Sequence, residues 1–536
     1  MSHLIIAPVV LPAVIGPLII LWMRNDLLLQ RVFSVTGTAL LVAVALYLNV
    51  LAAGGDVQVY RLGNWAAPFG IVLMLDRLAA LMLLLTAGLA LAVQLYAIGS
   101  GWDRKGRHFH ALWQFQLMGI CGAFLTGDAF NLFVFFEVLL IASYGLMIHG
   151  GGEMRLRAGV QYIAYNLAGS TLFLAALGVL YSVTGTLNMA DMALRVAAMP
   201  AEDTALLRVG AVLLMLVFAV KAALVPLHFW LPSTYANAPG PVAALFAIMT
   251  KVGVYGIIRF FTLVFPQDAV TQGVAADLLL PAALFTLAIG QIGILGTRHL
   301  GRLAAFAAIG SIGTLMIAVA QFTPQGTSAA VYYMIHSTLA AGALFLIVDM
   351  IGARRGDLWL RLERVMPGNG LVAALYFTAA IAVVGMPPFS GFIGKLLVMQ
   401  ATGAAPAMVW IWATILITSL IAIYAMSRAG SIVFWKSFEL GPAPAPAPAS
   451  ATAQPAAAEA SAPLSPKLEP DEPIQDLGDA PANWLAVASV ALLLSGIVAL
   501  TAFAGPAMRF AEATAAQLHN PDAYVSAVLE GQEDTK

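Results

Sequence analysis

Long apolar runs recur over almost the whole length of this chain, and they constrain its fold more than any other feature. A membrane-spanning helix needs about 20 mainly apolar residues, whereas a strand of a membrane barrel needs about ten residues of alternating polarity. We identify fourteen candidate spans, centred near Ile15, Leu41, Leu84, Leu117, Val138, Leu172, Met215, Ile248, Leu284, Ile312, Ala340, Ala380, Leu416 and Leu494. Because these runs do not alternate, they predict an all-α polytopic membrane protein with about 14 transmembrane helices.

The composition supports this class and excludes others. Of the 536 residues, 61% are hydrophobic and 10% are charged, whereas soluble domains carry about 25% charged residues. The formal net charge is −1, so we expect no nucleic acid partner, because such proteins present a clustered basic surface. The single cysteine, Cys121, excludes an intrachain disulfide and a multi-cysteine metal site. The sequence contains no quinone, flavin or metal motif, so we predict no cofactor.

Basic residues concentrate in the odd-numbered loops between the predicted spans. These loops carry Arg24, Arg31, Arg104, Lys105, Arg107, Arg155, Arg157, Arg298, Arg302, Arg354, Arg355, Arg361 and Arg364. The positive-inside rule then places the odd loops in the cytoplasm and both termini outside it, in a bacterial inner membrane.

The chain divides into a membrane core and an appended last span. Residues 1–438 form a core of 13 predicted spans, and residues 439–482 are a Pro/Ala-rich, mildly acidic stretch that predicts an extended cytoplasmic linker. Residues 483–505 form the last span. In the tail, residues 506–536, the segment Met508 to Leu518 predicts a short amphipathic helix at the surface.

Five ionisable residues lie well inside apolar runs: Glu137, Lys221, Lys251, His336 and Lys395. A lysine or acid at mid-bilayer costs about 2.5–3.5 kcal/mol on insertion scales, so such residues normally face the bundle interior and mark ion or proton paths. Lysine suits proton transfer because burial lowers the pKa of an ammonium group and a nearby carboxylate raises it again. Lys221 with Glu137 fits this arrangement, and the other three are further stations.

Two spans are interrupted by proline close to these lysines. Lys221 is followed by Pro226, and Lys395 is preceded by Pro387 and Pro388. Proline breaks a helix, and broken helices at membrane depth are tolerated only where they line a cavity or are buried in protein. Spans four to eight and nine to thirteen each have such a break on their fourth member. They therefore predict two five-helix repeats, and the odd number of helices makes the second repeat inverted.

Structural roles for the five ionisable residues remain as alternatives. Lys251 and Lys395 are placed so that a long side chain can reach the membrane interface. Glu137 and Lys221 can form a static ion pair, and His336 can be a hydrogen-bonded core histidine.

Three further residues are accessory candidates. Asp76 stands beside Arg77 near the start of span three, where an interfacial or structural role fits better than a catalytic one. His228 follows the first break and either lines proton access from the cytoplasm or is structural. Phe136, with Phe135, stands beside Glu137 and is positioned to shape access to it.

Four segments carry a family resemblance: KAALVPLHFWLPSTYANAPGPVAALFAIMTKVGVYGIIR from Lys221, GDAFNLFVFFEVLLIASYGLM from Gly127, GTLNMAD from Gly185 and GMPPFSGFIGK from Gly385. They resemble antiporter-like membrane subunits of Mrp-type multisubunit Na⁺/H⁺ antiporters, respiratory complex I and membrane-bound hydrogenases. The likeness runs from about residue 5 to 438 and is closest to the D-type component of the Mrp antiporter. The A-type component is similar but carries a large additional C-terminal membrane region. One antiporter-like component of complex I resembles the chain closely but has glutamate in place of Lys395.

The resemblance implies a role for each of the five residues. Glu137 is then the acid on span five, Lys221 its partner on broken span seven, and Lys251 the central relay. His336 bridges toward the second half-channel, and Lys395 on broken span twelve is the terminal station.

The resemblance also implies a function and partners. The chain is then no enzyme itself but one component of a multisubunit Na⁺(K⁺)/H⁺ antiporter driven by the proton motive force. Its partners are the lipid bilayer and the other subunits, including a related larger antiporter-like one. The alternative is a proton-pumping component of complex I or a membrane-bound hydrogenase. A scaffold without transport is disfavoured, because it has no reason to keep four charged residues buried.

Overall fold

The computed structural model describes residues 2–65, 67–200, 204–266, 273, 275–437 and 483–529. The predicted linker, residues 439–482, lies outside these ranges. The helices are α1 (Ala7–Trp22), α2 (Leu27–Ala53), α3 (Arg77–Gly99), α4 (Phe109–Leu125), α5 (Ala129–Met147), α6 (Glu153–Thr184), α7 (Met189–Ala197), α8 (Ala205–Ala222), α9 (Trp230–Asn237), α10 (Gly240–Leu263), α11 (Ala276–Gly296), α12 (Leu300–Val319), α13 (Pro324–Arg355), α14 (Asn369–Val384), α15 (Ser390–Ala401), α16 (Met408–Gly430), α17 (Trp484–Ala502), α18 (Ala504–Leu518) and α19 (Asp522–Leu529).

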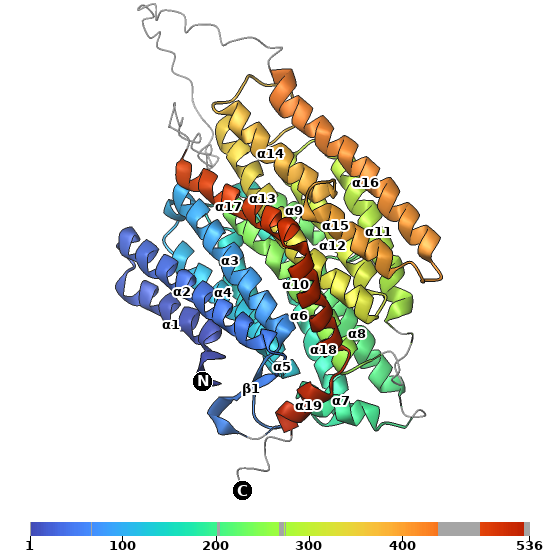
Figure 1. The fold of residues 1–536 in the computed structure, drawn as a ribbon. Helices are drawn as coiled ribbons and strands as arrows, with labels where there is room; N and C mark the ends of the chain where they lie inside the picture. Colours follow the sequence, from blue (N-terminus) through green and yellow to red (C-terminus); the bar gives the residue numbers. More distant parts are fainter. Residues whose placement is uncertain are drawn as a thin grey trace, which may run out of the picture.

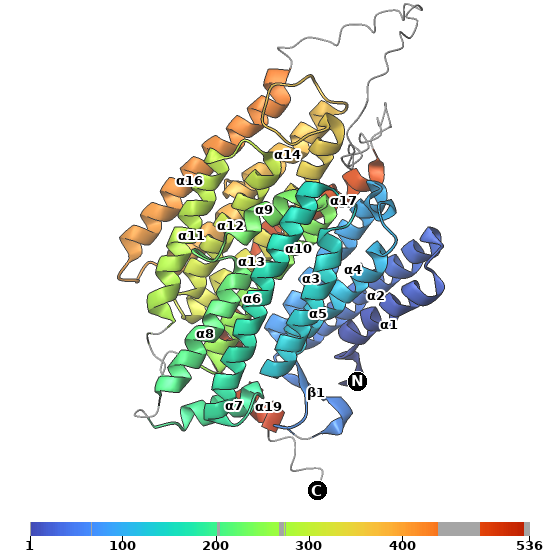
Figure 2. The same ribbon diagram turned by 180° about the vertical axis from the view of Figure 1, so that it is seen from behind.

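Most of these helices run side by side in one bundle (Figures 1 and 2). Among the described residues, 11 helices are long and apolar enough to cross a membrane. Three shorter apolar helices, α1, α4 and α14, lie at three further predicted spans. The all-α polytopic class is therefore confirmed, and the count of fourteen spans stays a prediction.

Short polar side chains start several helices of this apolar chain. Asp26, Asp76 and Asp128 each accept a hydrogen bond from a backbone N–H of the first turn, at 3.0, 2.8 and 2.7 Å. Such caps satisfy donors that have no partner within the helix. The carboxylates at span ends therefore have a local role in setting where the helices begin.

The two predicted repeats share a backbone pairing. In the first repeat, Asp128 before α5 forms an isolated antiparallel bridge with Asn188 after α6. In the second, His299 before α12 forms the same kind of bridge with Trp359 after α13. The same number of residues separates the partners in both bridges, so the repeats correspond residue by residue through this region.

The two bridges lie at opposite ends of α3. Thr126, next to the first bridge, pairs with strand β2 (Val72–Leu75), which directly precedes α3. The second bridge follows α13, and near the end of α13 the Asp349 carboxylate accepts a hydrogen bond from Trp102, just after the end of α3. The second repeat is therefore inverted relative to the first, as the sequence predicts.

Both predicted breaks are present. The fourth span of the first repeat is split into α8 and α9, and Ala223 at the end of α8 has a left-handed backbone with φ of 56°. The fourth span of the second repeat is split into α14 and α15, with Gly385 at φ of 79°. Pro226, Pro387 and Pro388 lie between the paired half-helices.

The basic loops share one end of the bundle. Arg31, near the start of α2 beside the first loop, forms an ion pair of 2.6 Å with Asp103 of the third loop. Arg155, at the start of α6 beside the fifth loop, donates to the Asn237 carbonyl at 3.0 Å and lies over the ring of Trp102. The odd loops therefore cluster, as the charge pattern requires if they face one side of a membrane.

The C-terminal helices reach the opposite end. Helix α18 follows α17 almost directly and packs along α13, with His519 joined to Thr327 at 2.9 Å. Arg61 of β1 (Gln58–Arg61) then donates to carbonyls of α19. The predicted tail helix thus exists, but it packs against the core, and both ends of the described chain lie near this end (Figure 1).

Candidate functional site

The five ionisable residues come from five helices, α5, α8, α10, α13 and α15, and none of them is exposed. Lys251 is 1% exposed and lies at the middle of α10, a helix in which every residue is buried. It is about 16 Å along the helix from either end, so its side chain does not reach an interface. Lys395 is 8% exposed and is also held inside the bundle.

Glu137 and Lys221 are linked through α6 rather than directly. The Ser170 hydroxyl donates to the Glu137 carboxylate, and the Lys221 ammonium contacts the Asn166 amide oxygen at 3.5 Å. Ser170 and Asn166 are one turn apart. The side chains of Asn166, Ser170 and Lys221, with Phe136, line a cavity of about 10 Å³. This is room for about one water, and among the described residues Glu137 and Lys221 form no direct ion pair.

The break after Lys221 leaves backbone groups that side chains satisfy. Trp230 of α9 donates its indole N–H to the Val220 carbonyl at 3.0 Å, and Thr286 of α11 accepts from the Val225 N–H at 2.9 Å. The Lys221 ammonium lies on the last turn of α8, where the helix dipole favours a positive charge. The backbone groups at the break therefore keep hydrogen-bond partners, and the end of α8 stabilises the Lys221 ammonium.

The second break holds Lys395 in a similar way. Its ammonium donates to the Val384 carbonyl at the end of α14 and to the Ser419 hydroxyl of α16, both at 2.7 Å. His336 is bound to the same break, because its Nδ1 lies 2.9 Å from the hydroxyl of Ser390, the first residue of α15. Each repeat thus places a lysine ammonium at the carboxyl end of its first half-helix.

His336 of α13 lies within electrostatic range of a lysine of each repeat, Lys251 and Lys395. A cavity of about 10 Å³ beside it is lined by small side chains of α12, among them Ala304, Ala308 and Ser311. This cavity has room for about one water, so a water molecule fits beside the His336 ring.

A family model described as "NADH:quinone oxidoreductase/Mrp antiporter, TM" matches residues 126–422, which include all five residues. The chain belongs to this family. A probable D-type subunit of a K⁺/H⁺ antiporter from Rhizobium meliloti is 39% identical over 565 residues, covering 99% of this chain and 98% of the relative. The D-type subunit of a Na⁺/H⁺ antiporter from Bacillus subtilis is 37% identical, covering 83% and 89%.

Solved structures agree with this assignment to the antiporter-like family. A chain of the Mrp complex from Dietzia sp. is 29% identical with a TM-score of 0.83, covering 98% of this chain and 99% of that one. A chain of respiratory complex I from Thermus thermophilus is 26% identical with a TM-score of 0.74, covering 96% and 99%.

The accessory candidates of this family member occupy different places. Phe136 lines the cavity beside Lys221, and its ring centre is 5.8 Å from the ammonium. His228 is buried in the break between α8 and α9, and its Nδ1 has no partner within the described part of the chain. Asp76 lies at the start of α3, in an ion pair with Arg259 of α10.

Sequence reasoning missed the neutral partners of the site. Asn166, Ser170, Ser390 and Ser419 carry no signal, because Ser and Asn are common in helices that contact other helices. Arg259 was missed although a signal existed, since it is a charge inside an apolar run at two helical turns from Lys251.

Proposed function

We propose that the chain is the D-type component of a multisubunit monovalent cation (Na⁺ or K⁺)/H⁺ antiporter and carries the proton path of that complex. The observation that carries the proposal is the set of ionisable groups inside the bundle, in which half-buried Glu137 is followed by buried Lys221, Lys251, His336 and Lys395. The nearly full-length similarity to the Rhizobium protein supports the antiporter assignment. A scaffold gains nothing from burying these charges, which are costly in a membrane.

Proton transfer follows from the spacing of the charges. An ionised Glu137 favours the charged form of Lys221, and a charged lysine disfavours a second positive charge nearby. Protonation of Lys221 therefore promotes release of a proton from the next station, Lys251. Water, including water in the cavities beside Lys221 and His336, carries the proton from one station to the next, through His336 to Lys395.

The second repeat lacks an equivalent acid. By the matched bridges, the position equivalent to Glu137 is Ala308, nine residues after His299 as Glu137 is nine after Asp128. Ala308 lines the cavity beside His336. The parts of the proton path in the two repeats are therefore chemically different. In the first repeat a carboxylate controls the proton affinity of the lysine, and in the second the lysine has only hydroxyl and carbonyl partners.

In this role the chain lies in a bacterial inner membrane, beside the other components of the antiporter complex. One of these is a related, larger antiporter-like protein. The clustered basic loops then face the cytoplasm, and both termini lie outside. The chain needs no cofactor for this role. A pumping component of a complex I-type enzyme is the alternative, and the lower similarity to the Thermus chain favours it less.

The test is antiport by everted vesicles that contain the whole complex. Adding Na⁺ or K⁺ to vesicles with an acid interior should collapse the pH gradient with the wild-type chain and not with Lys221→Ala. Lys436→Ala is the matched control, because Lys436 is exposed at the end of the membrane core. Wild-type exchange rates in Lys221→Ala complexes of normal abundance would refute the proposal.

A further inference from the structure

A second line of polar groups leaves the path at Lys251. Tyr255 and Arg259 follow Lys251 at successive single turns on the same face of α10. Eight residues of helix span about 12 Å. The line therefore leads from mid-depth to the end of α10 that lies opposite the basic loops.

The members of this line are bonded to each other and to the core. The Tyr255 hydroxyl donates to the Phe124 carbonyl at 2.7 Å and accepts from Arg259 at 3.1 Å. Arg259 also forms a 2.5 Å ion pair with Asp76, and the two side chains are 4% and 2% exposed. Removing both charges from water costs more than such a pair usually returns in stability, so a role in transport accounts for the pair better than a role in folding.

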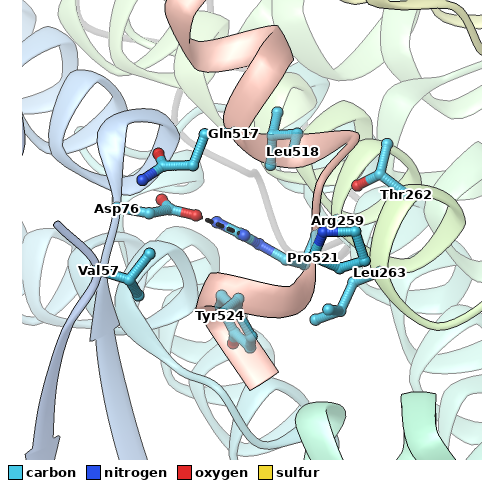
Figure 3. A pocket seen from close by; sticks show the side chains of 9 residues that line it. All are labelled: Val57, Asp76, Arg259, Thr262, Leu263, Gln517, Leu518, Pro521 and Tyr524. Carbon is cyan, nitrogen blue, oxygen red and sulfur yellow. Dashed lines mark ion pairs between the residues drawn. The ribbon is translucent and has the colours of Figure 1, made fainter. Parts of the chain in front are cut away.

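The ion pair borders a small cavity that the C-terminal helices close (Figure 3). Its volume is about 10 Å³, and its lining includes Asp76, Arg259, Gln517 and Tyr524. Gln517 of α18 anchors the cover, because it accepts from the Arg77 N–H and donates to the Gly55 carbonyl, both at 3.0 Å.

Tyr524 of α19 completes the cover. Its ring centre is 5.3 Å from the Arg259 guanidinium, and its side chain is buried. Its hydroxyl has no hydrogen-bond partner within the described part of the chain, and Tyr524 is one of the residues that line the cavity. An unpartnered buried hydroxyl beside a cavity with room for water is a natural contact for a water in transit.

We propose that Tyr255, Arg259 and Asp76 form a half-channel joining Lys251 to the side opposite the basic loops, with α18 and α19 as its cover. The inference rests on the proposed proton path. In the inward direction the Asp76 carboxylate takes a proton from water at the outer end and releases it to water on its inner side, and water beside Tyr255 passes that proton to the Lys251 amine. Arg259 stays charged at all working pH values, so it repels Na⁺ and free cations at the mouth.

Substitutions of the two partners of the ion pair should affect passive proton leak differently in proteoliposomes that hold the whole complex. Arg259→Gln removes the barrier and keeps the acceptor, so passive proton leak without Na⁺ should rise about tenfold or more, and Lys251→Leu in the same chain should abolish that rise. Asp76→Asn keeps the helix cap and the barrier but removes the acceptor. Its antiport rate should fall about tenfold with no rise in leak.

If the substitutions merely damaged the fold, the proton leak would change in the same direction in both variants. An equal rise in leak for both, no rise in Arg259→Gln, or a leak that survives Lys251→Leu would overturn the half-channel. If the ion-pair variants do not assemble, Tyr524→Ala replaces them and should raise a Lys251-dependent leak, whereas exposed Tyr424→Ala should not. Absence of antiport in the wild-type complex would instead refute the proposed function.

Discussion

Gly253 allows α10 to approach α8 closely beside two lysines of the path. A Cβ atom at this position would lie 2.6 Å from the Phe218 carbonyl oxygen and 2.7 Å from the Ala222 backbone nitrogen. Ordinary contacts begin near 3.4 Å, so Gly253→Ala must push α10 away from α8 by about 0.8 Å. The change separates Lys251 from Lys221, because these residues lie next to the contact on the two helices.

The expected loss is larger in transport than in stability. Overpacking costs about 1–3 kcal/mol, and alanine recovers about 0.5–1 kcal/mol over glycine within a helix, so the complex should still assemble. A displacement near 1 Å lowers the rate of a step that needs aligned groups by up to about 100-fold. We expect cation-driven proton movement in everted vesicles to fall at least about tenfold per assembled complex.

Gly178→Ala is the matched control. Gly178 also lies within a helix, α6, but a Cβ atom there meets nothing within 4 Å. Its antiport rate should equal that of the wild type. Antiport at the wild-type rate in Gly253→Ala, or an equal loss of antiport in Gly178→Ala, would refute the dependence of transport on this helix spacing.

Three further predictions concern the acid, the loops and the partners. Glu137→Asp should retain more antiport than Glu137→Gln in the same vesicle assay, because the carboxylate charge sets the affinity of Lys221 for its proton. Burial raises the pKa of Asp103, but hydrogen bonds from His110 and Arg31 outweigh it and hold that pKa below its usual range. Asp103→Asn should therefore cost about 1–3 kcal/mol at neutral pH, since Arg31 is partly exposed, and the difference in thermal unfolding midpoint from the wild type should disappear as the pH falls through the lowered pKa. Purified chain alone in liposomes should show no Na⁺-dependent proton movement until the other components are added, because Glu137 is the only carboxylate deep in a predicted span and Na⁺ prefers several oxygen ligands.

The membrane fold was predictable because its signals are local in the sequence. Runs of apolar residues give the helices, and Pro226 and Pro387 mark the breaks. The inverted repeat followed from counting spans, although the halves share little sequence. The structure explains this, because the repeats share a backbone pairing, Asp128 with Asn188 and His299 with Trp359, which does not depend on side-chain identity.

The site was predictable only where charge is costly. Lys251 and Glu137 stand out because an ionisable group inside an apolar run needs a reason to be there. Ser170 and Asn166 give no such signal, and their role depends on which helix packs against which. Asp76 was expected to be interfacial or structural, and its pairing with Arg259 joins helices far apart in sequence, which no local pattern reveals.

The C-terminal tail was also predictable only in part. The segment Met508 to Leu518 has the polarity of a surface helix, and a helix is found there as part of α18. Its packing along α13 and the link from His519 to Thr327 are tertiary contacts. They connect the end of the chain to the outer mouth proposed above.

The central claim is that protons driving cation exchange pass through the buried lysines of this chain. The most direct measurement is simultaneous recording of proton and Na⁺ flux in proteoliposomes holding the whole complex with Lys251→Leu. We expect both fluxes to stop together while the complex remains assembled, because exchange is coupled through this relay. Sodium-driven proton movement at the wild-type rate in that variant would contradict it.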